Sequence, residues 1–208
     1  MSLAAFWLYL GAVALISATP GPNVLYVTTR ALRFGFGAAM IGVTGCLAAL
    51  TVMLTGSVAG VGAFMLAVPA AFAALKYAGA AYLIFLGIQT WRAPPVALPD
   101  ESDPPRAEAS AWSLFRGGFL CGISNPKLLV FAAAFFPQFM APSAPWLPQF
   151  ALLVATFLAM ETSFYIVYSL TGRGLAHHLM EAVWQRRINR VSGAVFAGFG
   201  CALLRYRP

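Results

Sequence analysis

Two short segments carry the residues best suited to binding a small polar molecule. They are Ala18-Thr19-Pro20-Gly21-Pro22-Asn23 and Ser124-Asn125-Pro126-Lys127. A proline lacks a backbone N–H and cannot continue a helix, and a glycine adopts turns that strain other residues. Each segment therefore interrupts a helix and leaves amides and carbonyls unpaired. Such helix ends suit a zwitterion with a carboxylate and an ammonium group, and an amino acid is one.

Three polar side chains lie next to these interruptions. Asn23 and Asn125 both donate and accept hydrogen bonds, so they are expected to cap the broken helices, to contact the ligand, or to do both. A charge at the centre of a membrane helix costs about 2.5–3.5 kcal/mol on insertion scales, so Lys127 needs a partner. That partner is either a substrate carboxylate or the carbonyls freed at the interruption. The predicted substrate site consists of Pro20, Gly21, Pro22, Asn23, Asn125, Pro126 and Lys127.

Glu161 is the one carboxylate that lies well inside an apolar stretch. Four of the other acidic residues fall in the segment 100–108, and the remaining one is Glu181. A carboxyl group at membrane depth can gain and lose a proton, and proton relays of transporters use such groups. We therefore predict that Glu161 couples transport to a proton gradient. The alternative is a salt bridge or a hydrogen bond between helices.

The composition of the whole chain is that of an integral membrane protein. Of its 208 residues, 61% are hydrophobic and 9% are charged, whereas soluble domains average about 25% charged residues. A helix needs about 20 apolar residues to cross a bilayer core. Six stretches meet this requirement, at 3–29, 38–62, 66–91, 116–140, 147–171 and 190–206. We predict an all-α protein with six transmembrane helices, the first and fourth broken at proline.

The position of the two interruptions indicates an internal repeat. Successive halves of three spans enter the membrane from opposite sides, so homology between them makes an inverted repeat. Aligning Pro20 with Pro126 starts each half with a broken helix, and 76–82 then aligns with 190–196 through a basic residue, a glycine and an aromatic residue. The expected organisation is a first three-helix repeat (1–92), a cytoplasmic linker rich in proline and acid (93–115) and a second three-helix repeat (116–208).

The arginines indicate the topology. The loops after the first, third and fifth stretches carry Lys or Arg, and those after the second and fourth carry none. The positive-inside rule places the odd loops in the cytoplasm and both termini outside, although Arg205 and Arg207 argue the other way. Between 173 and 190, apolar residues recur near helical spacing among basic ones. This pattern predicts a short helix in the cytoplasmic interface.

Several functions are disfavoured by what the sequence lacks. Cys46, Cys121 and Cys201 are far apart and have no cysteine or histidine partner at metal-ligand spacing. There is no phosphate-binding loop, nucleophile elbow or H-E-x-x-H motif. The net charge of +7 comes from scattered arginines and does not form a basic face for nucleic acid. We predict no enzyme activity, no metal and no cofactor.

In combination, these motifs resemble the LysE-type family of amino-acid exporters, which includes the lysine and the homoserine/threonine exporters. The resemblance covers nearly the whole chain. It rests on Thr19-Pro20-Gly21-Pro22-Asn23, the glycines in 35–45, Lys76-x-x-Gly79-Ala80-x-Tyr82-Leu83-x-x-x-Gly87, Phe115-Arg116-x-Gly118-Phe119, Asn125-Pro126-Lys127 and Phe136-Pro137-Gln138-Phe139. It implies a bacterial inner-membrane exporter of amino acids or close derivatives, driven by proton exchange. The chain departs from the family at Cys46, where many members carry an acid, and at Glu161.

The predicted function is a secondary transporter whose partners are an amino-acid substrate, protons and the lipid bilayer. A homo-oligomer is compatible with the sequence. One alternative is a thiol-redox membrane protein of similar repeat architecture. It would need a cysteine in each of the first and fourth stretches, and only Cys121 qualifies. The other alternative is a membrane assembly or sensor component, which would carry no substrate flux.

Overall fold

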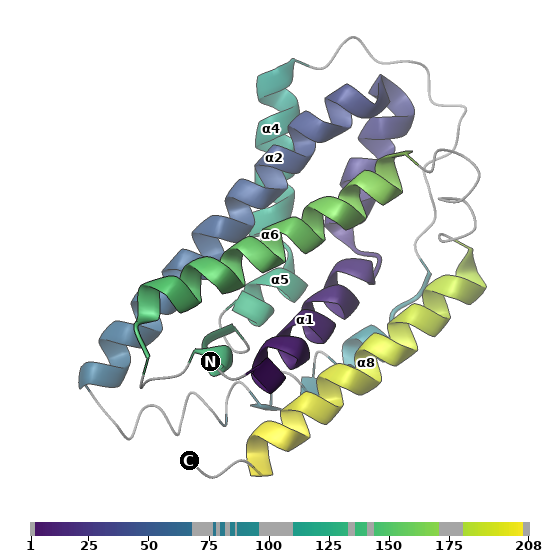
Figure 1. The fold of residues 1–208 in the computed structure, drawn as a ribbon. Helices are drawn as coiled ribbons and strands as arrows, with labels where there is room; N and C mark the ends of the chain where they lie inside the picture. The colour runs from purple at the N-terminus through teal and green to yellow at the C-terminus, as the bar shows by residue number, and fades with distance from the viewer. Residues whose placement is uncertain are drawn as a thin grey trace.

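The structure is a computed structural model that describes residues 3–67, 77, 80–81, 84–85, 87–95, 110–132, 136–140, 144–170 and 181–205. Its elements are α1 (Leu3–Ala18), α2 (Pro22–Ala67), α4 (Ala111–Ile123), α5 (Pro126–Val130), the 3₁₀-helix η2 (Phe136–Phe139), α6 (Trp146–Leu170) and α8 (Ala182–Arg205) (Figure 1). All of these are helices, so the predicted all-α class is confirmed for the described residues. Lys76, most of the predicted linker and the segment 171–180 lie outside them.

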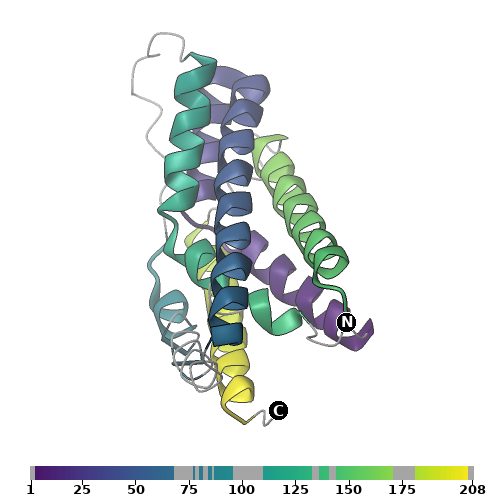
Figure 2. The ribbon, with the colours of Figure 1, turned by 90° about the vertical axis from the view of Figure 1, so that its left-hand side faces the viewer.

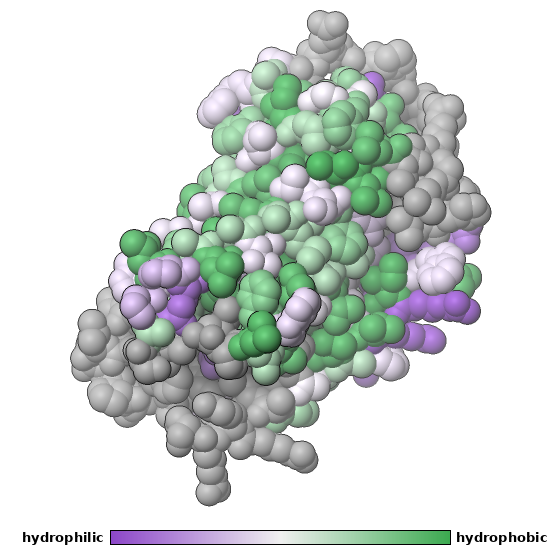
Figure 3. Space-filling view, viewed as in Figure 1, coloured by the Kyte–Doolittle hydropathy of each residue, from purple (hydrophilic) through white to green (hydrophobic). Residues whose placement is uncertain are grey.

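The described helices agree with a membrane location. The segment Pro22–Val58 of α2 and the whole of α6 are long and apolar enough to cross a membrane, and α1 is a shorter apolar helix. The face seen in Figure 3 is largely hydrophobic along α6. Large apolar side chains of α6 such as Leu152 and Leu170 are exposed. Exposed apolar side chains on a helix surface are expected where that surface meets lipid.

Both predicted helix interruptions are confirmed. α1 ends at Ala18, residues 19–21 are not helical, and α2 begins at Pro22. Proline is favoured at the first position of a helix because its missing N–H would have no helical partner there. α4 ends at Ile123, and α5 begins at Pro126. Each interruption therefore divides one predicted stretch into two helices.

The loop predicted at 30–37 is replaced by a single sharp turn. α2 remains helical up to Gly35, whose φ of 84° and ψ of 171° depart from helical geometry. Only glycine adopts this backbone conformation without strain. α2 thus consists of a first arm, 22–34, and a second arm, 36–67, which turn at this residue (Figure 1).

Two other helix boundaries differ from the prediction. α4 begins at Ala111, ahead of residue 116, because the Ser110 side chain caps it by accepting a 3.2 Å hydrogen bond from the Ser113 amide. α8 begins at Ala182, so 182–190 forms its first turns, and a separate interfacial helix is wrong for these residues. No proline or glycine interrupts the sequence between 182 and 192, and the helix continues through it.

The two broken helices approach each other from opposite ends of the molecule. Two views at right angles place α1 in the lower half and α4 in the upper half (Figures 1 and 2). α5 continues from the end of α4 into the middle of the bundle. The interruption after α1 and the one before α5 consequently meet near the centre.

Aromatic side chains fill the space beside α1. Tyr9 is fully buried, its hydroxyl donates a 2.9 Å hydrogen bond to the Leu153 carbonyl, and its ring lies 5.0 Å from that of Phe139. Phe136 and Phe131 pack against the same ring. This cluster fixes α1, η2 and α6 relative to one another in the half of the bundle that α1 occupies.

Glycines allow the second arm of α2 to pack closely against α4. A Cβ atom at Gly45 would overlap the Phe115 carbonyl, and one at Gly118 would overlap the Gly42 carbonyl. Small residues at such crossings let helix backbones approach each other in membranes. The close approach places Cys46 of α2 against Gly122 of α4, immediately before the second interruption.

Gly45→Ala should therefore destabilise the protein, whereas Gly56→Ala on the same helix should not. Overpacking of this kind costs about 1–3 kcal/mol. A Cβ at Gly56 meets open space, and alanine has the higher helix propensity. Thermal unfolding of the two purified variants in one detergent measures the difference. Equal melting temperatures would contradict the close packing at Gly45.

Candidate functional site

Lys127 connects the two interruptions. Its ammonium group donates hydrogen bonds to the carbonyls of Ile16, at 2.7 Å, and Thr19, at 2.9 Å. Carbonyls at the end of a helix have no partner within that helix, and Pro20 removes the amide that would continue the ladder. A cation at a helix C-terminus also interacts favourably with the helix dipole. Of the two partners considered for Lys127, the structure shows the freed carbonyls.

Asn125 caps α5, and capping is one of the two roles expected for it from the sequence. Its Oδ1 accepts a 3.1 Å hydrogen bond from the Lys127 backbone amide, which satisfies one of the free amides at a helix start. The side chain is almost completely buried, with 1% of its surface exposed. Asn125 therefore holds the backbone of Lys127 in place directly beside the first interruption.

Asn23 is bound by two other helices instead of capping its own. Its Nδ2 donates to the Tyr165 hydroxyl on α6 at 3.1 Å, and its Oδ1 accepts a 3.4 Å contact from the Cys121 thiol on α4. The residue is 3% exposed. The first arm of α2 is thus fixed to both α4 and α6 directly after the interruption.

Glu161 lies at the same level of the bundle as the first interruption. It is 2% exposed, and its Oε1 accepts a 2.9 Å hydrogen bond from the Ser17 hydroxyl at the end of α1. It also forms a hydrogen bond with Tyr165, one helical turn further along α6, and interacts electrostatically with Lys127. The hydrogen bond between helices that was considered for Glu161 is present, and it leaves the carboxyl group beside an ammonium group.

These side chains surround a narrow pocket. Its volume is about 190 Å³, and part of this space is open to the outside. The unoccupied space is divided into gaps too narrow for a water molecule. The described lining carries one carboxylate and one ammonium group, which could pair with the two charges of an amino acid. The lining residues are Ser17, Gly21, Asn23, Val24, Asn125, Lys127, Leu128, Glu161 and Tyr165.

The structure brings together most of the residues predicted from the sequence. Five of them line the pocket: Gly21, Asn23, Asn125, Lys127 and Glu161. Pro20 is buried and Pro22 is exposed, and both border the interruption without lining the pocket. Pro126 is the first residue of α5. The prolines therefore shape the backbone, and their neighbours supply the polar groups.

Sequence reasoning missed Ser17, Tyr165 and Tyr168. The Tyr168 hydroxyl donates a 2.9 Å hydrogen bond to the Ala18 carbonyl, another free helix end at the interruption. Tyr165 follows Glu161 by four residues, the spacing that places two side chains on one helix face, and this signal was available. Ser17 has no comparable sequence signal, because its role depends on how α1 packs against α6.

Thr19 also links the first interruption to α8. Its hydroxyl shares a 2.6 Å hydrogen bond with that of Ser192 on α8 and donates to the Leu15 carbonyl. Both Thr19 and Ser192 are buried.

In the part of the chain that the structure describes, no three His, Cys, Asp or Glu side chains gather in a possible metal site.

Known proteins similar to this chain include a translocator family, an efflux protein and an uncharacterized membrane protein. The family model described as LysE type translocator matches residues 14–207. The chain is 30% identical over 199 residues to the homoserine/homoserine lactone efflux protein of Salmonella typhimurium. The aligned residues make up 96% of this chain and 95% of the relative. It is also 30% identical over 198 residues to an uncharacterized membrane protein of Vibrio cholerae, covering 95% of each. No solved structure gave a significant match.

Proposed function

Since this chain belongs to the LysE type translocator family, we propose that it exports amino acids or close derivatives across the bacterial inner membrane in exchange for protons. The family consists of translocators, and the chain is read as a transporter and not as an enzyme. The observation that carries the proposal is the pocket between the two interruptions, where the Lys127 ammonium and the Glu161 carboxylate lie together.

The substrate class follows from the groups around this pocket. The Lys127 ammonium suits a substrate carboxylate, and the Glu161 carboxylate suits a substrate ammonium group. The remaining lining offers the hydroxyl of Ser17 and the amide of Asn23, which suit a short polar side chain. The relative from Salmonella typhimurium is named for homoserine and homoserine lactone, so we propose a small hydroxylated amino acid of this kind.

Alternating access is the mechanism that we propose for release. Because the gaps in the pocket are too narrow for a water molecule, substrate binding requires α1 and α4 to separate from their neighbours. In this proposal 1–92 and 116–208 are inverted three-helix repeats connected by the linker 93–115. The opposite approach of α1 and α4 supports this arrangement. So does the crossing of the third and sixth predicted spans, where Gly87 packs on Gly193 and Ala80 on Gly200.

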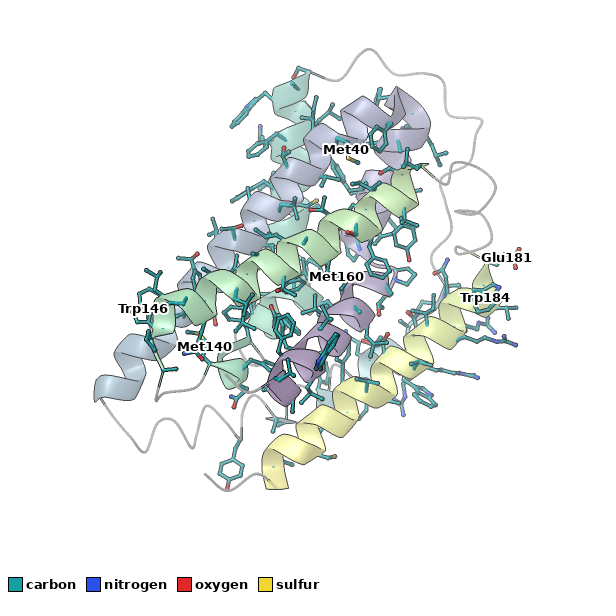
Figure 4. The ribbon with its side chains drawn as sticks, viewed as in Figure 1. Met40, Met140, Trp146, Met160, Glu181 and Trp184 are labelled. Atoms are coloured by element: carbon teal, nitrogen blue, oxygen red, sulfur yellow. The ribbon has the colours of Figure 1, made fainter. Side chains whose placement is uncertain are left out.

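We propose a topology with both termini outside. Trp146 and Trp184 lie toward opposite ends of the bundle (Figure 4), as tryptophans at the two membrane interfaces do. Arg187 stacks on Trp184, with 5.3 Å from the guanidinium carbon to the ring centroid. Arg186 is also exposed in this first part of α8. The positive charges at the Trp184 end support a cytoplasmic position for it.

Flux measurements in proteoliposomes test the proposal. Vesicles containing the purified protein are loaded with one unlabelled amino acid from a panel, and the uptake of the same labelled amino acid is measured by counterflow. We expect counterflow of homoserine and similar short polar amino acids above that of protein-free vesicles. Net efflux should accelerate when a proton gradient is imposed. A panel with no counterflow at all would contradict amino-acid export.

A further inference from the structure

The hydrogen bonds around Glu161 continue through the pocket to the first interruption. We infer that Tyr165 is a positioning residue that transmits the protonation state of Glu161 to Asn23, so that proton binding loosens the substrate site. The inference rests on the proposed function and adds to it the route by which a proton and a substrate influence each other.

The direction of each hydrogen bond follows from the chemistry of the groups. An ionised carboxylate only accepts hydrogen bonds, so Glu161 accepts from Ser17 and from the Tyr165 hydroxyl. The Tyr165 oxygen in turn accepts from Asn23 Nδ2, and Asn23 Oδ1 accepts from the Cys121 thiol. Every donor in the series thus points toward Glu161. The series connects α4, the first arm of α2 and α6.

Burial makes this series sensitive to a single proton. The exposed fractions are 1% for Ser17, 2% for Glu161 and Tyr165, and 3% for Asn23. Water therefore cannot replace a bond that is lost, and an unpaired polar group in such surroundings is costly. Hydrogen bonds in a low-dielectric interior also polarise one another. A change at Glu161 is consequently felt at Asn23.

Protonation of Glu161 weakens the first link. The carboxyl group then carries an O–H donor, and the Tyr165 hydroxyl loses its anionic acceptor. The hydrogen bond from Tyr165 to the neutral carboxyl group is weaker than the bond to the carboxylate, and the Tyr165 oxygen becomes a poorer acceptor for Asn23. The ionised form therefore holds Asn23 in place and preorganises the interruption for substrate, which favours affinity. The protonated form releases it, and a bound amino acid dissociates more readily, as exchange for a proton requires.

Among the residues that the structure describes, the other titratable groups around Glu161 are Lys127 from α5, Cys46 from α2 and Tyr168 from α6. Cysteine and tyrosine are ordinarily neutral at neutral pH, which leaves Lys127 as the charged neighbour. Lys127 is bound to the carbonyls of Ile16 and Thr19, so it lies outside the series that links Glu161 to Asn23. Removing the Tyr165 hydroxyl should interrupt that series while the charges stay in place.

The test compares Tyr165→Phe with Tyr9→Phe, which removes a buried hydroxyl outside the pocket. Homoserine counterflow is measured in proteoliposomes at mildly alkaline and mildly acidic pH, and the apparent affinity is determined at each. Acidification should weaken the affinity of the wild type and of Tyr9→Phe equally. In Tyr165→Phe counterflow should persist. The ratio of the apparent affinities at the alkaline and the acidic pH should be about fivefold smaller than in the wild type, which is equivalent to one buried hydrogen bond.

A double variant separates transmission from a purely structural role. Glu161→Gln/Tyr165→Phe should have the same pH profile as Glu161→Gln alone, because residues in one network are not additive. A wild-type profile in Tyr165→Phe, additive effects in the double variant, or loss of counterflow in Tyr165→Phe would each overturn the inference. A wild type that exchanges homoserine with no pH dependence would instead contradict proton exchange in the proposed function, and the inference with it.

Discussion

Replacing Glu161 with glutamine should abolish proton-driven export while amino-acid exchange continues. Glutamine has the shape of glutamate, and its carbonyl oxygen can still accept the hydrogen bond from Ser17 that is 2.9 Å long in the structure. It cannot take up a proton. Efflux from Glu161→Gln vesicles should therefore be the same with and without an imposed pH gradient, and it should need a higher amino-acid concentration because the substrate ammonium group loses its carboxylate partner.

Glu181→Gln is the matched control. Glu181 directly precedes α8 and lies at the edge of the molecule, away from the centre of the bundle (Figure 4). The same chemical change there should leave the response to the gradient intact. A Glu161→Gln protein whose efflux still accelerates with the gradient would exclude Glu161 as the coupling residue and leave its hydrogen bond to Ser17 as its whole role.

Lys127→Met should have the largest effect on both stability and exchange. Methionine fills a similar volume but donates no hydrogen bonds, so the carbonyls of Ile16 and Thr19 would lose the ammonium that binds them. A hydrogen bond to a charged group contributes about 1.5–3 kcal/mol, so the loss of two should lower the melting temperature clearly. Counterflow should fall to the level of protein-free vesicles, because the substrate carboxylate loses its cation.

Lys127→Arg distinguishes the two roles, since it retains a cation and several donors in a different geometry. We expect partial recovery of thermal stability and weak counterflow. A Lys127→Met protein with a reduced melting temperature but normal homoserine affinity would show that Lys127 only closes the end of α1. That result would remove Lys127 from the proposed substrate site and leave its structural contacts unchanged.

The parts of the site that the sequence predicted are those set by local chemistry. Pro20 and Pro126 lack the N–H that continues a helix, and Gly21 tolerates the turn between two prolines, so both interruptions were predictable. Their meeting followed from the expected opposite orientation of the two halves. Asn125 and Lys127 come directly from the second interruption, and their place at the pocket needs no knowledge of how the other helices pack.

The parts that the sequence did not predict depend on packing between distant segments. The partners of Asn23 come from α4 and α6, and they are fixed by the rotation of each helix about its own axis. The rotation of α4 follows from its close contact with α2 at Gly45 and Gly118. The spaced glycines indicate a packing face, but they do not specify which helix it meets. The same limit applied to the connection at 30–37, where the sequence predicted a loop and the structure has helix on both sides of a turn at Gly35.

Photochemical labelling tests most directly whether an amino acid binds where the two interruptions meet. The purified protein is irradiated with a diazirine derivative of an amino acid that passes the counterflow test, and the labelled peptides are mapped by mass spectrometry. We expect adducts within 17–24 and 125–128, and we expect the unmodified amino acid to suppress them. Adducts confined to other segments, or adducts that the amino acid does not suppress, would contradict a substrate site between α1 and α5.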